Sequence, residues 1–115
     1  MADSSEIEVR RDQRDTGTVL QPIGDVDLSR APSLRSHLVQ SIEAKPPRLV
    51  VNMDAVHYMD SAGVATLIEA MTLARTAAVP FFLCALNKQV MDTLQITRLD
   101  GVFTITDDVD AALTM

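Results

Sequence analysis

The chain has 115 residues, 47% hydrophobic and 23% charged, which predicts one globular domain over residues 6–115 behind a short flexible tail of residues 1–5. Ten Lys and Arg against sixteen Asp and Glu give a formal net charge of −6, which disfavours binding to nucleic acids and to acidic membranes. With one cysteine, no signal-peptide pattern and no long apolar run, we expect a cytoplasmic protein without disulfides or membrane insertion.

The first predicted elements are two strands joined as a hairpin. Ile7 and Val9 alternate with charged residues, residues 10–17 are polar and end in a turn signal, and residues 18–23 are apolar again. Pro22 has no N–H to donate to a neighbouring strand, so it should lie at the end of the second strand or on an unpaired edge.

A helical spacing follows the hairpin. Apolar residues recur four apart between positions 34 and 42, Ser29 or Asp27 is available as a cap, and Pro32 falls in the expected first turn. The prolines at positions 46 and 47 end this helix.

Two apolar runs, residues 48–53 and residues 80–86, are typical of strands that are covered on both faces of a sheet. Between them, the polar residues 54–61 predict a loop, and residues 62–77 carry the apolar spacing of a second long helix. Buried strands that alternate with helices indicate a mostly parallel sheet.

The last part of the chain predicts three short elements. Asn87 can cap a short helix, residues 102–105 form a last strand, and residues 108–113 form a last helix. The predicted order is β-β-α-β-α-β-α-β-α, an α/β fold with a mixed sheet and its helices mainly on one face.

The stretch from His57 to Gly63 is the most informative for function, because it joins a buried strand to the start of a helix. In α/β sheets, ligands and partners bind at the carboxyl ends of the strands, and the first turn of a helix favours an anion. A phosphate on Ser61 would be tolerated there. On residue types alone, either Asp60 or Ser61 is the N-cap of the predicted helix over residues 62–77. If Asp60 is the cap, the Ser61 hydroxyl is not needed for capping.

Small residues stand at the predicted start of this helix. Ala62 is followed by Gly63, although glycine inside a helix costs about 1 kcal/mol relative to alanine. Close access by a partner and packing against the sheet would explain them equally well. Met59 is a candidate exposed contact beside Asp60, although methionines in loops also fill gaps in a core.

Several segments of the chain resemble one family. The tetrad Asp60-Ser61-Ala62-Gly63 after a strand, residues 24–27 after the second strand, and residues 99–103 and 111–113 are similar to the STAS domain of bacterial anti-sigma-factor antagonists. The resemblance covers nearly the whole chain from Ile7 onward, and the tetrad is its most specific part.

This resemblance implies a STAS fold and a non-catalytic switch. An anti-sigma-factor serine kinase, which supplies ATP and magnesium, would bind the unmodified domain, release its sigma factor and phosphorylate Ser61. A metal-dependent serine phosphatase would reset the switch. Asp27 matches the family's acidic residue beside the kinase contact, and the predicted partner-binding residues are Asp27, Met59, Asp60, Ser61 and Gly63. The alternative is a STAS adaptor that is not phosphorylated, as a subunit of a transporter or of a stress-signalling assembly.

Other chemistries fit the residues less well. A serine hydrolase elbow needs a glycine two residues before Ser61, where Met59 stands, and His57 lies in the same loop without a separate acidic partner. A response-regulator receiver needs an acidic pair after its first strand and a lysine after its fifth, and this sequence has neither there. Aspartates in these loops are commoner as caps than as magnesium ligands, so we predict no bound metal or cofactor.

Asp27 follows the second predicted strand, and Asp60 follows the third. If these strands are neighbours, both carboxylates reach the same end of the sheet and flank Ser61. The resulting negative charge would attract a basic partner surface and speed the encounter. If Asp27 instead caps the following helix, an Asp27→Asn substitution should leave partner binding intact.

Overall fold

The computed structural model describes residues 5–115, so the predicted tail lies outside the described residues except for Ser5, which is part of a turn. The helices and strands follow one another in the predicted order. They are β1 (Glu8–Arg14), β2 (Gly17–Ile23), α1 (Ala31–Glu43), β3 (Leu49–Asn52), α2 (Ser61–Thr76), β4 (Phe81–Cys84), α3 (Lys88–Ile96), β5 (Thr104–Thr106) and α4 (Val109–Leu113).

The strands form one sheet in the order β1-β2-β3-β4-β5. β1 is antiparallel to β2, and the remaining neighbours are parallel, so the predicted mixed sheet is confirmed. β3 lies at the centre, where Val50 is paired with Val19 on one side and with Phe82 on the other. β1 and β5 are the two edges of the sheet.

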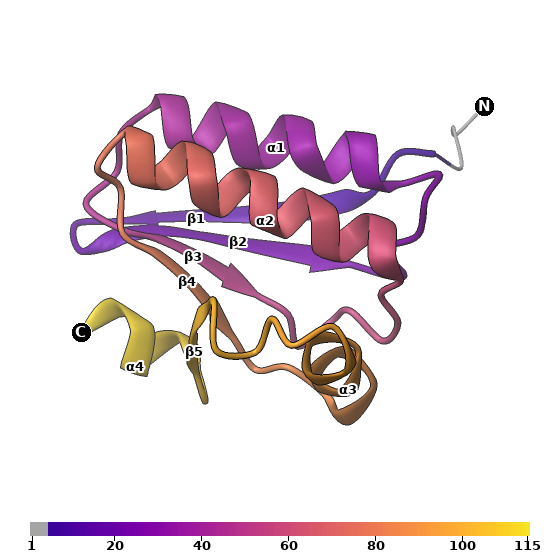
Figure 1. Cartoon of the computed structure of the whole chain (residues 1–115). Helices are drawn as coiled ribbons and strands as arrows, with labels where there is room; N and C mark the ends of the chain where they lie inside the picture. Colours follow the sequence, from indigo (N-terminus) through magenta and orange to yellow (C-terminus); the bar gives the residue numbers. More distant parts are fainter. Residues whose placement is uncertain (1–4) are drawn as a thin grey trace.

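Different helices cover the two faces of the sheet, because successive residues of a strand point to opposite sides. Leu49 and Val51 of β3 pack into the main core with the buried residues of α1, α2 and α3. Val50 points the other way and packs with Ala112 and Leu113 of α4. In Figure 1, α1 and α2 lie side by side above the sheet and α4 lies below it. The helices are thus mainly on one face, as predicted.

The structure corrects the boundaries of the hairpin. Residues 10–14, predicted as part of a polar turn, continue β1, and the turn consists only of Asp15 and Thr16. Polar residues are compatible with this strand because it is an exposed edge. Pro22 lies near the end of β2, beyond Leu20, the last β2 residue paired with β3, as its missing N–H requires.

The other elements depart little from their predicted bounds. Asn87 caps α3, and Pro32 lies in the first turn of α1, both as predicted. α2 begins at Ser61, one residue earlier than predicted, because Asp60 is its N-cap. β5 begins and ends slightly later than predicted. Because α2 begins directly after the loop that follows β3, its start lies at the carboxyl end of that strand.

Candidate functional site

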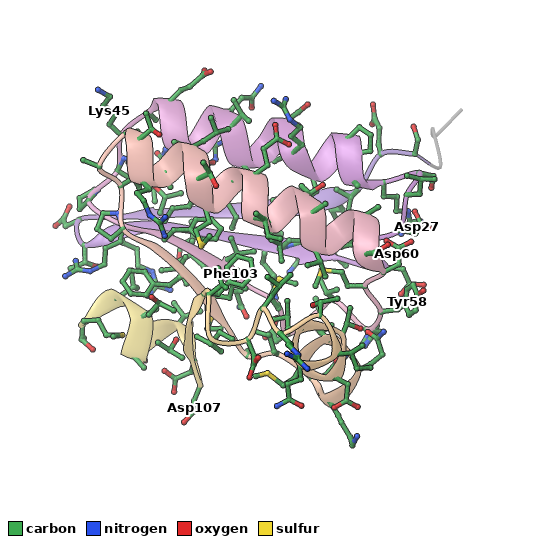
Figure 2. All side chains as sticks on the ribbon, in the orientation of Figure 1. Asp27, Lys45, Tyr58, Asp60, Phe103 and Asp107 are labelled. Carbon is green, nitrogen blue, oxygen red and sulfur yellow. The ribbon has the colours of Figure 1, made fainter. Side chains whose placement is uncertain are left out.

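The carboxyl ends of β2 and β3 are joined beyond the strands themselves. Val26 and Met59 form an isolated parallel bridge, in which the Val26 N–H donates to the Tyr58 carbonyl oxygen (2.9 Å) and the Asp60 N–H donates to the Val26 carbonyl oxygen (3.2 Å). Asp27 and Asp60 therefore lie at the same end of the sheet, and Figure 2 shows them there with Tyr58. The prediction that both residues lie at the same end of the sheet is confirmed.

Asp60 and Ser61 have different roles at the start of α2. The Asp60 carboxylate oxygen Oδ1 accepts hydrogen bonds from the backbone N–H groups of Ala62 (2.9 Å) and Gly63 (3.3 Å). Ser61 is exposed, and within residues 5–115 its hydroxyl makes no hydrogen bond. The Ser61 Oγ is therefore available to a partner, at a helix end whose N–H groups favour negative charge.

Met59 and Gly63 belong to the core, so the prediction of Met59 as an exposed contact was wrong. Met59 is completely buried, and Gly63 is buried with it. A Cβ atom at position 63 would lie 2.4 Å from Met59 Cγ and 2.9 Å from Val26 Cγ1. Of the two explanations for this glycine, packing is therefore the correct one. The Met59 side chain fills the space beneath the start of α2 and supports the Ser61 turn from inside.

Asp27 lies in a turn of its own just before α1. Its Oδ1 accepts from the Ser29 hydroxyl (2.7 Å) and from the Arg30 backbone N–H (3.1 Å). These hydrogen bonds, the one from Ser29 first, hold the pKa of Asp27 below its ordinary value, so the carboxylate is ionised at neutral pH. The expectation that Asp27 or Ser29 caps α1 is wrong: the N-cap is Arg30, which makes no side-chain capping bond, because the turn delays the start of the helix to Ala31.

Two exposed apolar side chains, which were not among the predicted site residues, flank Asp27 and Asp60. Leu28 is 75% exposed beside Asp27, and Tyr58 is 45% exposed beside Asp60. The available signal was that Leu28 stands between polar turn residues, outside the apolar spacing of α1. Apolar and aromatic groups next to charged ones are typical of surfaces that bind proteins. We name the surface formed by Asp27, Leu28, Tyr58, Asp60 and Ser61 the Ser61 rim.

The loop that carries Tyr58 and Asp60 is held by side chains of α3 and its cap. Gln89 Oε1 accepts from the Met59 N–H (3.0 Å), and Gln89 Nε2 donates to the Met59 carbonyl oxygen (3.2 Å). Asn87 Nδ2 donates to the carbonyl oxygens of Val56 (3.1 Å) and His57 (3.2 Å). Gln89 could not be found from the sequence, because no local pattern marks a contact between residues 30 positions apart.

The sequence matches the STAS domain profile over residues 6–112. The chain belongs to the STAS domain family. This STAS domain is similar in fold to an anti-sigma factor antagonist from Mycobacterium paratuberculosis, with a TM-score of 0.86 and 24% identity over 99% of this chain and 97% of that one.

Two further structures share the fold. SpoIIAA of Bacillus, an anti-sigma factor antagonist, is similar in its unphosphorylated form (TM-score 0.74, 17% identity, 90% of each chain) and in its phosphorylated form (TM-score 0.67, 19% identity, 91% of this chain and 93% of that one). SLC26A9 matches with a TM-score of 0.73 and 14% identity over 84% of this chain, but only 19% of the SLC26A9 chain is covered. The same fold thus occurs in small chains and as a minor part of a large one.

Within residues 5–115, the Ser61 hydroxyl has no hydrogen-bonded base. His57 is exposed, and no hydrogen bond joins it to Ser61 in the described part of the chain. Burial, with smaller contributions from Asp54 and Asp108, raises the pKa of the Cys84 thiol to about 11, so it stays protonated and unreactive. Among residues 5–115, no group of three His, Cys, Asp or Glu side chains is placed to hold a metal ion. No described helix is long and apolar enough to span a bilayer.

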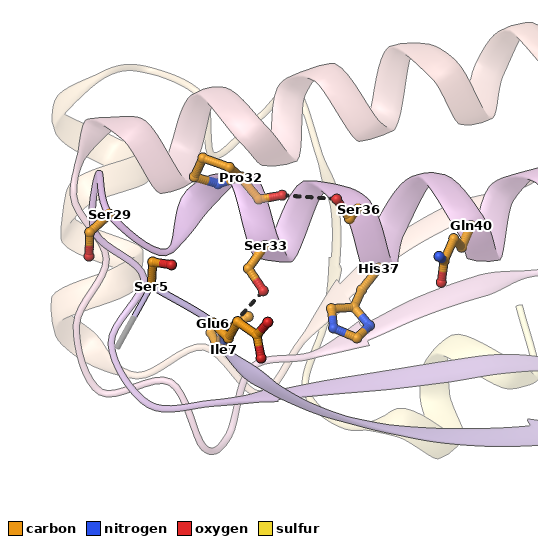
Figure 3. Close-up of a pocket in the computed structure, with 9 residues that line it drawn as sticks. All are labelled: Ser5, Glu6, Ile7, Ser29, Pro32, Ser33, Ser36, His37 and Gln40. Carbon is orange, nitrogen blue, oxygen red and sulfur yellow. Dashed lines mark hydrogen bonds between the residues drawn. The ribbon is translucent and has the colours of Figure 1, made fainter. Parts of the chain in front are cut away.

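A polar hollow of about 540 Å³ lies between α1 and the segment that leads into β1 (Figure 3). Ser33 accepts a hydrogen bond from the Ile7 backbone N–H (3.1 Å), which fixes the start of the hairpin against α1. Ser29 also lines this hollow and donates to Asp27. None of the residues of the Ser61 rim lines it. The hollow therefore borders the rim without being part of it.

Proposed function

We propose that this STAS domain is an anti-sigma-factor antagonist whose affinity for its partner is controlled at Ser61. Unmodified, it binds an anti-sigma-factor serine kinase through the Ser61 rim, and the kinase then releases its sigma factor. The observation that carries this proposal is the position of Ser61, an exposed residue that begins α2. Because Asp60 is the N-cap of this helix, the Ser61 hydroxyl is not needed for capping. The similarity to SpoIIAA, whose structures include a phosphorylated form, supports it.

The phosphorylation step needs only the Ser61 hydroxyl from this chain. Ser61 Oγ attacks the γ-phosphorus of ATP, which the kinase holds with magnesium, and the bond from that phosphorus to the ADP oxygen breaks. The hydroxyl proton passes to a base of the kinase. A metal-dependent serine phosphatase then hydrolyses the phosphoserine and releases inorganic phosphate. The domain acts as substrate and binding partner rather than as an enzyme.

A phosphate on Ser61 changes the charge of the rim. It adds about −1.5 to −2 charges beside the carboxylates of Asp60 and Asp27. The start of α2 tolerates this charge within the domain, so the fold persists. Inside an interface the same phosphate would be desolvated and repelled by any acidic neighbour. A hundredfold loss of affinity corresponds to about 2.7 kcal/mol, which such a phosphate can supply.

The test compares Ser61 variants for binding to the cognate kinase and for labelling in the presence of ATP. Ser61→Ala should bind like the wild type without being labelled, and Ser61→Asp should bind about a hundredfold more weakly. Ser36→Asp is the matched control, because Ser36 is exposed on α1 outside the rim. A label at another residue, or tight binding by Ser61→Asp, would contradict the proposal.

The second candidate function is an adaptor that uses the Ser61 rim without phosphorylation, as a subunit of a transporter or of a stress-signalling assembly. The match to SLC26A9 favours it, because the STAS fold there lies within a much larger chain. In that case Ser61→Ala and Ser61→Asp should keep the same partner with similar affinity. Neighbouring genes also separate the two functions: a serine kinase or sigma factor gene supports the switch, and permease and ATPase genes support the adaptor.

A further inference from the structure

β1 is an uncovered edge of the sheet. It pairs with β2 on one side, and no strand within residues 5–115 pairs with its other side. Six of its seven residues are exposed, and only Val9 is half-buried. In an antiparallel ladder alternate residues direct their backbone N–H and C=O groups outward, so this edge presents unpaired donors and acceptors to a further strand.

The side chains of β1 that share one face alternate in charge. Glu8, Arg10, Asp12 and Arg14 lie on the face covered by α4, as the ion pair between Arg14 and Asp110 of α4 (3.8 Å) shows. The intervening residues face α1, and among them Arg11 donates to Ser41 of α1 (3.0 Å). On the α4 side of β1, the side-chain charges are therefore negative, positive, negative and positive along the strand.

This pattern is complementary to itself in one antiparallel register. A two-fold axis at Arg11 places Glu8 opposite Arg14 and Arg10 opposite Asp12, and each of these pairs occurs twice. Moving the axis to position 12 places Asp12 opposite itself and Arg10 opposite Arg14. Moving it to position 10 places Arg10 opposite itself and Glu8 opposite Asp12. Registers centred on Val9 or Gln13 join only three residues of each strand. Among the registers that join five or more residues of β1, only the one centred on Arg11 is free of like charges on this face.

We propose that two copies of this chain associate through β1 in this register, joining their sheets into one continuous sheet. Charged side chains on an edge strand usually prevent strand pairing. Here the same charges allow a second copy to pair along the whole of β1 and disfavour the registers centred on positions 10 and 12. The charge of β1 is small, because three arginines and two carboxylates sum to +1. Two copies of β1 therefore repel each other less than two surfaces that carry the net negative charge of the chain, −6.

The test uses charge reversals in the full chain, with the average mass measured by sedimentation equilibrium over a wide range of concentration. The wild type should form a dimer. Arg10→Asp places two carboxylates opposite each other, and Asp12→Arg places two guanidinium groups opposite each other, so each variant should lose at least about tenfold in association constant. An equimolar mixture of the two variants should dimerise again, because every cross pair in the mixed dimer is then of opposite charge.

Arg75→Asp on α2 and Asp100→Arg are the matched controls, because both residues are exposed outside β1. They should dimerise like the wild type, and circular dichroism should show that all variants remain folded. A wild type that stays monomeric, single reversals that leave the dimer unchanged, or a mixture that does not recover the dimer would each overturn the proposal. Phosphorylation at Ser61 is an independent readout, so this result does not decide the proposed function.

Discussion

The Ser61 rim and the β1 edge are both exposed and charged, but their charges are arranged differently. At the rim, Asp27 and Asp60 lie at the same end of the sheet, together with the exposed side chains of Leu28 and Tyr58. Along β1, positive and negative side chains alternate. A surface of one sign repels a copy of itself and fits a partner of opposite charge, whereas an alternating surface can fit itself. The arrangement of charge, more than its amount, therefore predicts the kind of partner.

The two surfaces also differ in the interactions that keep their residues in place. The rim is supported by buried Met59 and Gly63 and by the hydrogen bonds of Gln89, so its shape depends on residues outside the rim itself. β1 is held by its ladder with β2 and by the Arg11 contact to Ser41. Substitutions in the core should therefore affect the rim, and substitutions of exposed charges should affect the edge.

The largest effect is expected from Gly63→Ala, which places a methyl group within 2.4 Å of Met59 Cγ. The overlap should lower the free energy of unfolding by about 2 kcal/mol and weaken kinase binding, because the start of α2 has to shift. Urea denaturation measures the first effect. Gly101→Ala is the control, with nothing within 4 Å of its new methyl group and an expected change within about 0.5 kcal/mol. Equal stability of the two variants would mean that Met59 moves aside without cost.

The next effect is expected from Gln89→Ala, which removes both hydrogen bonds between the Gln89 side chain and the Met59 backbone. The free energy of unfolding should fall by about 1–2 kcal/mol, because the buried Met59 N–H loses its partner and the Met59 carbonyl oxygen keeps only the longer hydrogen bond from the Thr93 hydroxyl (3.4 Å). Hydrogen exchange of the Met59 amide should become faster, and phosphorylation at Ser61 slower. Gln95→Ala, at an exposed position of α3, is the control. Unchanged exchange at Met59 would show that the loop holds its shape without α3.

Most of the fold could be predicted from the sequence where burial leaves a pattern. The apolar run at β3 predicts a central strand because both of its faces are covered, one by the main core and the other by α4. The extension of β1 through residues 10–14 could not be predicted in this way. An edge strand with exposed side chains has the composition of a turn, and only its pairing with β2 reveals it.

The candidate site also has features that the sequence pattern predicts and features that it does not. The position of Ser61 at a helix start and the neighbourhood of Asp27 and Asp60 follow from strand order, which the sequence pattern predicts. The burial of Met59 and the contacts of Gln89 depend on side chains from distant segments meeting in space. No local pattern in a single sequence indicates such contacts between distant segments. The burial of Met59 could therefore not be predicted, and the prediction that it is exposed was wrong.

A smaller effect is expected from Arg11→Gln, a substitution in the middle of the β1 edge. Arg11 is the one residue of β1 that meets its own copy at the proposed two-fold axis, and its charge opposes association. Removing that charge should strengthen the dimer about threefold in sedimentation equilibrium. Arg75→Gln on α2 should leave the association constant unchanged. Weaker association of Arg11→Gln would place the axis elsewhere along β1.

The smallest effect is expected from Asp27→Asn, which removes one charge from the rim. Asparagine keeps an Oδ1 acceptor for Ser29 and Arg30, so the free energy of unfolding at pH 7 should change little. Because the folded pKa of Asp27 lies below its ordinary value, its carboxylate contributes stability above that ordinary value and loses it as the pH falls through the folded pKa. The variant should lack this acid-dependent loss.

The readout that separates binding from scaffolding is the rate of association with the kinase. Asp27→Asn should lower this rate about twofold at low salt, and the difference should vanish as added salt screens the rim. Asp100→Asn removes the same charge at an exposed position outside the rim and should have a smaller effect. Equal rates for the wild type and Asp27→Asn throughout a salt titration would confine Asp27 to its turn with Ser29, and the attraction of a basic partner would then rest on Asp60.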